Sequence, residues 1–364
     1  MSRLLAPHIS PSCSLSFRHE RGEAADCRIV AGFTPGWFRA RLPVDFSACW
    51  HRDPRYRHTT MQQMGQLLND TFPTLRLGDA EGTRGSISQV CTAAFIGGLF
   101  GLEVLFAPDQ WPVTCDRPLS DAEVAWLEPL DVRNTAVFAD LMRQMDLIEA
   151  EWGRIDGELN YQGVLNTAFR LRGEALFMDM ASEPECAHHL LGVVCETMLQ
   201  VIDAVHARQR ASGVRKDAFV TGNCVVNMIS SAHYREFVQP YDRRLSAHFP
   251  HFGIHNCAWR VDPYAPAYAE IRTLDYLDFG LDSDLALLRR LFPDTTLAPM
   301  YSPVALAENS PAQLRADLTR LRDTLSRCRI IVADIDATTP DTRVLEFFHL
   351  AAEVWEVPVA ALVG

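Results

Sequence analysis

The 364-residue sequence is nearly devoid of lysine: Lys216 is the only one, and arginine supplies the other basic residues. Schiff-base chemistry therefore has a single candidate amine, and a phosphate-binding GxxxxGK(S/T) loop is absent. The sequence also has no long run of basic residues, and its formal net charge is -12 at pH 7. Because nucleic acids and anionic membranes bind basic surfaces, neither is expected as a partner.

The ten cysteines form no CxxC pair, and the opening MSRLLAPHIS has no apolar signal core. Both features favour a cytoplasmic protein whose cysteines remain free thiols. The longest apolar stretch, residues 90–106, is interrupted by Glu103 and several glycines, so it predicts a buried helix and strand and no membrane span. The hydrophobic content of 48% is that of an ordinary globular protein, which excludes a disordered chain.

Helical and strand-like patterns alternate along most of the chain. The expected strands are residues 103–107, 160–165, 218–221, 252–256, 274–279, 296–300 and 329–333, and the expected helices are 59–69, 121–150, 184–211, 231–249, 282–292 and 311–327. Such alternation predicts an α/β fold with a parallel sheet, and the length fits a (β/α)8 TIM barrel over residues 85–364. Residues 1–84 are expected to form an N-terminal arm and helical extension. An open doubly wound sheet is the alternative, but no GxGxxG follows an early strand.

His255 and Cys257 are the sharpest candidates for chemistry, because they follow a predicted strand in a parallel sheet. Residues two apart in an extended chain point to the same side, and nitrogen and sulfur donors together favour zinc. We expect a third ligand from the end of the last strand, where Asp334 and Asp336 are the alternatives. Three ligands with an open position would make a catalytic site. An ordinary packed His–Cys pair is the competing interpretation.

Other polar residues follow predicted strands and are candidates for proton transfer or substrate contact. Asp282, Asn223 and Tyr161 are expected to be catalytic, and Tyr301 and Gln162 to bind substrate. The carboxylates of Asp282 and its neighbour Asp284 could equally cap the helix that begins there. Cys328 precedes its strand, so it should lie at the opposite end of the barrel from the site.

Three segments carry a resemblance to a known family: SAHYREFVQPYDRRLSAHFPHFGIHNC, LDYLDFGLDSDLALLRRLFPDTTLAPMYSP and CRIIVADIDATTPDTRVLEFF. They resemble the uroporphyrinogen decarboxylase superfamily, and most closely its zinc-dependent, corrinoid-linked methyltransferase branch, over roughly residues 85–355. The resemblance implies a TIM barrel with its active site at the carboxyl ends of the strands. In that branch an HxC motif and a later cysteine bind zinc. His255 and Cys257 match the HxC motif, whereas Asp334 is the nearest match to the later cysteine.

The resemblance implies a zinc enzyme that transfers a methyl group between a corrinoid and a thiol-type small-molecule acceptor. The corrinoid would belong to a separate protein, since the chain has no DxHxxG signature, and the resemblance is compatible with a homodimer. The alternative is a metal-free decarboxylase of uroporphyrinogen or another carboxylic acid. The segment GFTPGWFRARLPVDF lacks the arginine-glycine-arginine pattern of the decarboxylases, and Arg39 and Arg41 are its candidates for binding carboxylates. A barrel that binds a corrinoid or substrate without turnover is a third hypothesis.

Overall fold

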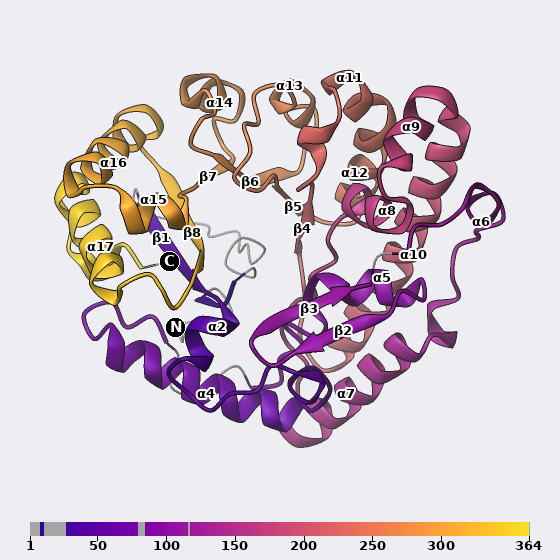
Figure 1. The fold of residues 1–364 in the computed structure, drawn as a ribbon, viewed down its shortest axis with the longest axis horizontal. Helices are drawn as coiled ribbons and strands as arrows, with labels where there is room; N and C mark the ends of the chain where they lie inside the picture. Colours follow the sequence, from indigo (N-terminus) through magenta and orange to yellow (C-terminus); the bar gives the residue numbers. More distant parts are fainter. Residues whose placement is uncertain (1–7, 11–26, 79–83, 116, 364) are drawn as a thin grey trace.

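A curled parallel sheet of six strands organises the fold, in the order β1-β8-β7-β6-β5-β4. The computed structural model describes residues 8–10, 27–78, 84–115 and 117–363. The strands are β1 (Cys27–Phe33), β4 (Ala218–Gly222), β5 (His251–His255), β6 (Leu274–Gly280), β7 (Thr296–Met300) and β8 (Cys328–Ile335). They follow an arc on the inner side of a ring, with helices on its outer side (Figure 1).

Nearly continuous apolar runs explain why these segments form a parallel sheet, because such a sheet is buried on both faces. In β6 and β8 almost every residue is buried. Val30, Tyr276, Ala298, Met300 and Ile331 pack together, with Ala333, in a small core contributed by the strands themselves. The remaining buried strand residues belong to the large core shared with the helices.

Helices make up much of the rest of the described fold, and about half of them begin at a side-chain cap. Their bounds are α2 (Pro35–Arg39), α3 (Ala48–Arg52), α4 (Pro54–Thr71), α5 (Phe95–Leu99), α6 (Asp121–Ala125), α7 (Ala136–Trp152), α8 (Val164–Arg172), α9 (Ala175–Ser182), α10 (Pro184–Ala211), α11 (Ser231–His233), α12 (Gln239–Ser246), α13 (Ala265–Tyr268), α14 (Leu285–Leu291), α15 (Pro303–Glu308), α16 (Pro311–Leu325) and α17 (Asp341–Trp355). Ser310 and Gln313 form a reciprocal capping box that fixes the start of α16.

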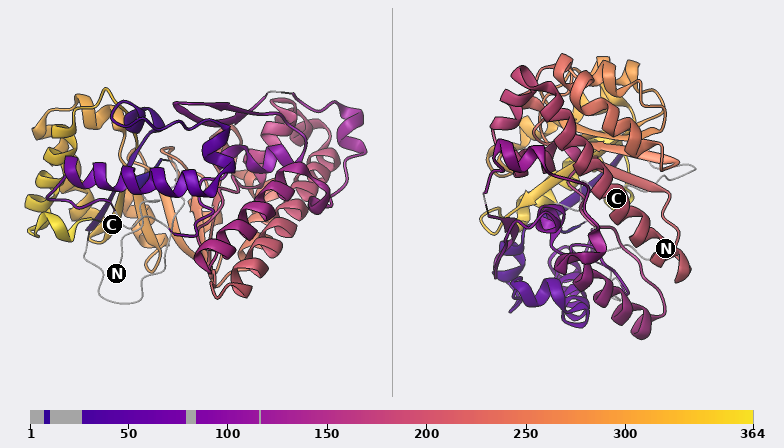
Figure 2. Two further views of the ribbon diagram at one scale, coloured as in Figure 1. Left: turned by 90° about the horizontal axis from the view of Figure 1, so that it is seen from below. Right: turned by 90° about the vertical axis from the view of Figure 1, so that its right-hand side faces the viewer.

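The two long helices α7 and α10 lie side by side (Figure 2), and Arg208 on α10 pairs with Asp146 and Glu149 on α7. Within the described residues, α10 is also the one helix long and apolar enough to cross a membrane. Of its most apolar window, 61% is buried inside the fold, which is the pattern of a core helix.

The predicted eight-stranded barrel is right only in part. Between β1 and β4 the described residues contain one antiparallel pair, β2 (Val104–Ala107) with β3 (Gln110–Thr114), and a single parallel bridge from Ser86 to Asp156. The parallel sheet therefore ends at β1 and β4, and the ring is completed on that side by the β2–β3 pair and helices (Figure 1). A full (β/α)8 closure is not present in this part of the chain.

Local backbone conformation explains the predicted strand that is missing. Residues 160–165 were expected to be extended, but Gln162 and Gly163 have φ of 61° and 91°, and α8 begins at the next residue. A Cβ on Gly163 would lie 2.1 Å from the carbonyl oxygen of Gly222, so only glycine fits there. Conversely, β1 lies in the predicted N-terminal extension, yet it pairs in parallel with β8 and is an edge of the main sheet.

The predicted helices are confirmed most closely where no turn signal lies inside them. Residues 184–211 coincide with α10, and residues 311–327 with α16 apart from the last turn. Residues 121–150 instead divide into α6, a short 3₁₀ turn and α7, because Ser120, Asp131 and Thr135 each cap a new helical start. Residues 231–249 divide into α11, a π-helical turn at Tyr234–Val238 and α12.

Candidate metal centre

A cavity of about 440 Å³ opens at the carboxyl ends of the strands. Residues at or just after the ends of β4, β5, β7 and β8 line it, together with residues of the loop before α8. Its lining consists of Asn160, Gln162, Gly222, Cys224, His255, Cys257, Ala258, Trp259, Met300, Tyr301, Ser302, Pro303, Ala333 and Asp334. This is the edge of a parallel α/β sheet at which ligands bind.

Three side chains in this lining converge as metal ligands do. The donor atoms of Cys224, His255 and Cys257 all lie within 4.8 Å of one another, and Cys257 Sγ is 3.1 Å from His255 Nε2. The sheet register produces this convergence, since Gly222 at the end of β4 pairs with His255 at the end of β5. Each strand is then followed by an asparagine and a cysteine, so the two thiols approach the imidazole from adjacent strands.

Asp278 on β6 fixes the orientation of His255. Its carboxylate is fully buried and lies 2.6 Å from His255 Nδ1, while the Asn256 N–H and the Tyr276 O–H donate to the same carboxylate at 2.7 and 3.2 Å. Register explains the contact, because His255 and Asp278 are direct partners across β5 and β6. With Nδ1 held by a carboxylate, Nε2 faces the two thiols, which is the usual orientation of a metal-binding histidine.

The three side chains of the cluster shift one another's pKa values. Burial opposes protonation of His255, but the Asp278 carboxylate and the two thiols outweigh it and raise its pKa well above the usual value. The hydrogen bond from the Cys257 thiol lowers the pKa of Cys224 despite burial, whereas that same bond and burial raise the pKa of Cys257. Two sulfurs and one imidazole nitrogen are ligands that zinc prefers, and three ligands leave a position for a substrate.

Comparison with known proteins identifies the family. The family model named Uroporphyrinogen decarboxylase (URO-D) matches residues 91–344. The chain belongs to the uroporphyrinogen decarboxylase family. Among solved structures, a methyltransferase from Methanosarcina mazei superposes with a TM-score of 0.62 at 11% sequence identity, over 93% of this chain and 96% of that one. At this identity the likeness establishes a shared fold. A search of curated proteins gave no match.

In this member of the uroporphyrinogen decarboxylase family, Cys224 occupies the place that the sequence assigned to an aspartate. Asp334 lines the cavity, but it is not in the group of converging donor atoms. Asp336 is exposed and accepts hydrogen bonds from the N–H and O–H of Thr338. Sequence reasoning missed Cys224, although the repeated pattern of an asparagine and a cysteine after neighbouring strands could have indicated it. Cys328 is the first residue of β8 and lies opposite Cys27 in the sheet register, at the end of the strands away from the cavity, as expected.

The three expected catalytic residues lie outside the cavity lining of this family member. Asn223 is buried, and its side-chain N–H donates to Asp242 at 2.9 Å while its backbone N–H donates to the His255 carbonyl at 2.7 Å. These bonds make Asn223 a support for the loop that carries Cys224. Asp282 is exposed in the turn after β6, and its neighbour Asp284 caps α14, as the structural interpretation of this acidic pair expected.

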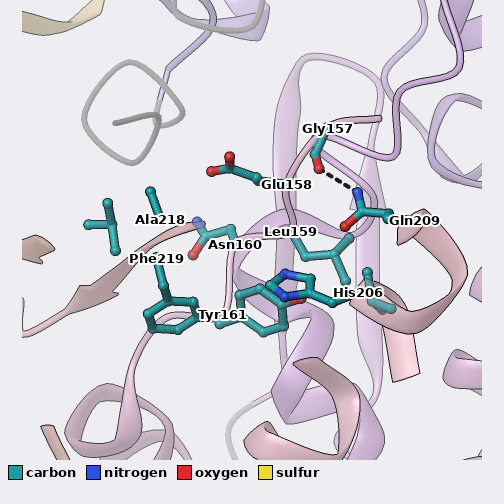
Figure 3. Close-up of a pocket in the computed structure, with 11 residues that line it drawn as sticks. Gly157, Glu158, Leu159, Asn160, Tyr161, His206, Gln209, Ala218 and Phe219 are labelled. Atoms are coloured by element: carbon teal, nitrogen blue, oxygen red, sulfur yellow. Dashed lines mark hydrogen bonds between the residues drawn. The ribbon is translucent and has the colours of Figure 1, made fainter. Parts of the chain in front are cut away.

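Tyr161 lines a second, much smaller cavity of about 20 Å³ (Figure 3). Cys224, His255 and Cys257 are not part of its lining. The ring of Tyr161 packs 5.4 Å from that of Phe219, and burial raises its pKa. Gln209 closes the same cavity by donating to the Gly157 carbonyl at 2.9 Å. The side chain of Tyr161 is therefore part of the core beside β4.

The two expected substrate-binding residues, Gln162 and Tyr301, do line the large cavity. Gln162 is held by a hydrogen bond from its backbone N–H to Asn160 Oδ1 at 3.0 Å. The Tyr301 O–H donates to Asp317 on α16 at 2.8 Å, and its ring packs 4.9 Å from that of Phe347, so this residue mainly supports the cavity wall.

Proposed function

We propose that this family member is an enzyme that binds zinc through Cys224, His255 and Cys257 and transfers a methyl group to a thiol acceptor. The observation that carries the proposal is the convergence of the three donor atoms within 4.8 Å in the wall of a substrate-sized cavity. A carboxylate-oriented histidine next to two sulfurs is the ligand arrangement of a protein zinc site. The sequence expectation of an HxC zinc site agrees with this geometry, with Cys224 replacing Asp334 as the third ligand.

Zinc, when bound, would supply the positive charge that keeps a thiol acceptor ionised and nucleophilic at neutral pH. The protein residues then have distinct tasks. Asp278 holds His255 Nδ1, and the Asn256 N–H holds Asp278 in turn. Asn223 ties the Cys224 loop to the His255 carbonyl, so both strand ends keep one relative position. Gln162 and Trp259 border the space in which the acceptor would bind.

In the proposed reaction a carbon–sulfur bond forms between the methyl group and the acceptor. The bond between the methyl group and its donor breaks, the donor keeps the electron pair, and the thiol proton leaves to solvent. We propose a methylated corrinoid on a separate protein as the donor, because the acceptor needs a strongly activated methyl group. The proposed enzyme is cytoplasmic, acts on a small-molecule acceptor and has the corrinoid protein as its partner.

The alternative of uroporphyrinogen decarboxylation receives little support from the described residues. A substrate with several carboxylates needs basic groups, yet no arginine or lysine occurs among the described residues that line the cavity. Arg41 is paired with Asp341 and stacks 4.1 Å from the centre of the Trp37 ring, and Arg39 donates to backbone carbonyls. The cavity therefore favours methyl transfer over decarboxylation of a polycarboxylate.

The proposal is tested by metal analysis and a methyl-transfer assay on the full-length protein. The purified chain should contain stoichiometric zinc and convert methylcobalamin and a thiol to cob(I)alamin and a methyl thioether under anaerobic conditions. His255→Ala and Cys257→Ser should lose both zinc and activity, whereas Cys49→Ser, which changes an exposed cysteine, should lose neither. Full activity after chelation would refute the proposal, and so would decarboxylation of uroporphyrinogen by the chelated protein.

A further inference from the structure

The large cavity carries negative charge outside the Cys224, His255 and Cys257 cluster. Apart from the metal cluster, Asp334 is the only ionisable acidic or basic side chain among the described residues of its lining. Asp278 lies behind the lining, is fully buried, and is engaged by His255. The described part of the wall therefore presents one carboxylate and no cationic side chain to a ligand.

The carboxylate of Asp334 makes no contact that holds the described part of the fold together. Within the described residues it takes part in no ion pair or hydrogen bond, although the backbone N–H of Asp334 donates to Ser10 Oγ at 2.8 Å. Its backbone is left-handed, with φ of 59°, and its side chain is exposed. A strained, exposed residue with an unengaged carboxylate at the end of a barrel strand is typical of a ligand-binding position.

Aromatic surface accompanies this carboxylate. Trp259 lines the cavity and leaves 48% of its surface exposed, so its ring is accessible to a ligand. The faces of tryptophan and tyrosine rings attract ammonium groups, with tryptophan the strongest. A carboxylate and an exposed tryptophan ring in one cavity wall thus suit a cationic group, whereas an anionic group placed beside Asp334 would be repelled by it.

We propose that the acceptor is a small thiol that carries an ammonium group, and that Asp334 binds this group while the sulfur lies at the cluster of Cys224, His255 and Cys257. This inference rests on the proposed function, because it assigns the substrate class of the same site. Zinc would compensate the ionised thiol, and the ammonium group of the acceptor would compensate the carboxylate of Asp334. Thiols that carry a sulfonate or carboxylate without an amine are excluded by the same reasoning.

The test compares three thiols with the same two-carbon chain and different charge: 2-aminoethanethiol, 2-mercaptoethanol and the bulkier 2-mercaptoethanesulfonate. Calorimetric titration of the zinc-loaded, full-length protein should give a Kd for the aminothiol at least about fivefold below that of mercaptoethanol, the effect of one modest ion pair. The sulfonate should bind most weakly. Asp334→Asn should abolish the preference, because asparagine keeps the shape and tolerates the left-handed backbone. Asp336→Asn, an exposed aspartate outside the lining, is the matched control and should keep it.

A second probe separates this inference from the proposed function. Propylammonium carries the cation without a thiol, and NMR should detect its Asp334-dependent binding to the metal-free protein. If zinc is never bound but propylammonium binding depends on Asp334, the proposed function fails and the cation site stands. If zinc is bound and methyl transfer occurs but the three thiols bind alike, or the sulfonate binds best, the inference is overturned.

Discussion

Replacing Cys224 by serine should weaken zinc binding far more than replacing Asp334 by asparagine. Cys224 is one of the three residues whose donor atoms lie within 4.8 Å of one another, and Asp334 is outside that group. The comparison therefore decides between the third ligand that the structure indicates and the one that the sequence suggested. It also separates a role in metal binding from the substrate role that we assign to Asp334.

The size of the effect follows from the number of ligands. Four-ligand zinc sites bind with apparent free energies of about 10–16 kcal/mol, so one ligand is worth roughly 2.5–4 kcal/mol. Loss of the Cys224 thiolate should thus raise the Kd by about two to three powers of ten. Asp334→Asn should leave the Kd unchanged within experimental error, because the carboxylate is not among the converging donors.

Competition with a chromophoric chelator measures these affinities, and cobalt substitution provides an independent readout. Each thiolate ligand adds sulfur-to-cobalt charge-transfer absorption, so Cys224→Ser should lose about half of the intensity. Cys49→Ser, which changes an exposed cysteine, should behave as wild type. Retention of zinc by Cys224→Ser together with its loss in Asp334→Asn would refute the assignment.

Three further predictions concern residues behind the cavity and the ion pair of the single lysine. Asp278→Asn should raise the zinc Kd about 10–100-fold while circular dichroism stays native, because this carboxylate orients His255; an unchanged Kd would contradict that role. Burial raises the pKa of Asp242 to about 6, so its contribution to stability is complete below pH 4 and lost as the pH rises through 6. Asp242→Asn should therefore unfold in denaturant with up to about 3 kcal/mol more stability than wild type at pH 8, a gain that disappears near pH 4. Burial opposes ionisation of Asp156, yet the Lys216 ammonium lowers its pKa to about 2, so this pair stabilises the fold above about pH 4 and fails as the pH falls toward 2. Lys216→Met should cost about 1–2 kcal/mol at pH 7, since the pair is partly exposed, and should flatten the acid limb of the stability profile measured by denaturant titration.

The strands with continuous apolar runs could be predicted from their local sequence. A strand could not be predicted where its formation depends on a partner strand that is distant in the chain. Residues 296–300 read as a strand and are β7, and the strand at residues 274–279 extends by one residue to form β6. β1 is different because its partner, β8, lies some three hundred residues further along the chain. Periodicity in the first sixty residues is weak, so nothing local indicates that Cys27–Phe33 completes the edge of the sheet.

The same distinction between local sequence and distant pairing applies to the residues of the site. His255 and Cys257 could be placed together from their spacing alone, because both belong to one extended segment. Cys224 could not, since its approach depends on the register that sets Gly222 opposite His255. Asp278 was missed for the same reason: in sequence it is one acidic residue within a buried strand, and only pairing across β5 and β6 places it against the imidazole.

Three residues with a left-handed backbone lie around this cavity. Gln162, Cys257 and Asp334 have φ of 61°, 56° and 59°, and all three line it. A left-handed conformation costs an ordinary residue roughly 1–2 kcal/mol, so the surrounding structure must hold these side chains in place.

Glycines at two strand ends provide that hold by letting neighbouring loops come unusually close. A Cβ on Gly222, which ends β4, would lie 2.4 Å from the carbonyl oxygen of Gln162. A Cβ on Gly280, which ends β6, would lie 2.1 Å from the carbonyl oxygen of Ala258, the residue after Cys257. The loops that carry Gln162 and Cys257 thus pack directly against the backbone of the glycines at these strand ends. The close approach of Gln162 and of the loop after Cys257 requires that those two strands end in glycine, which ties the position of a proposed zinc ligand to the packing of the sheet.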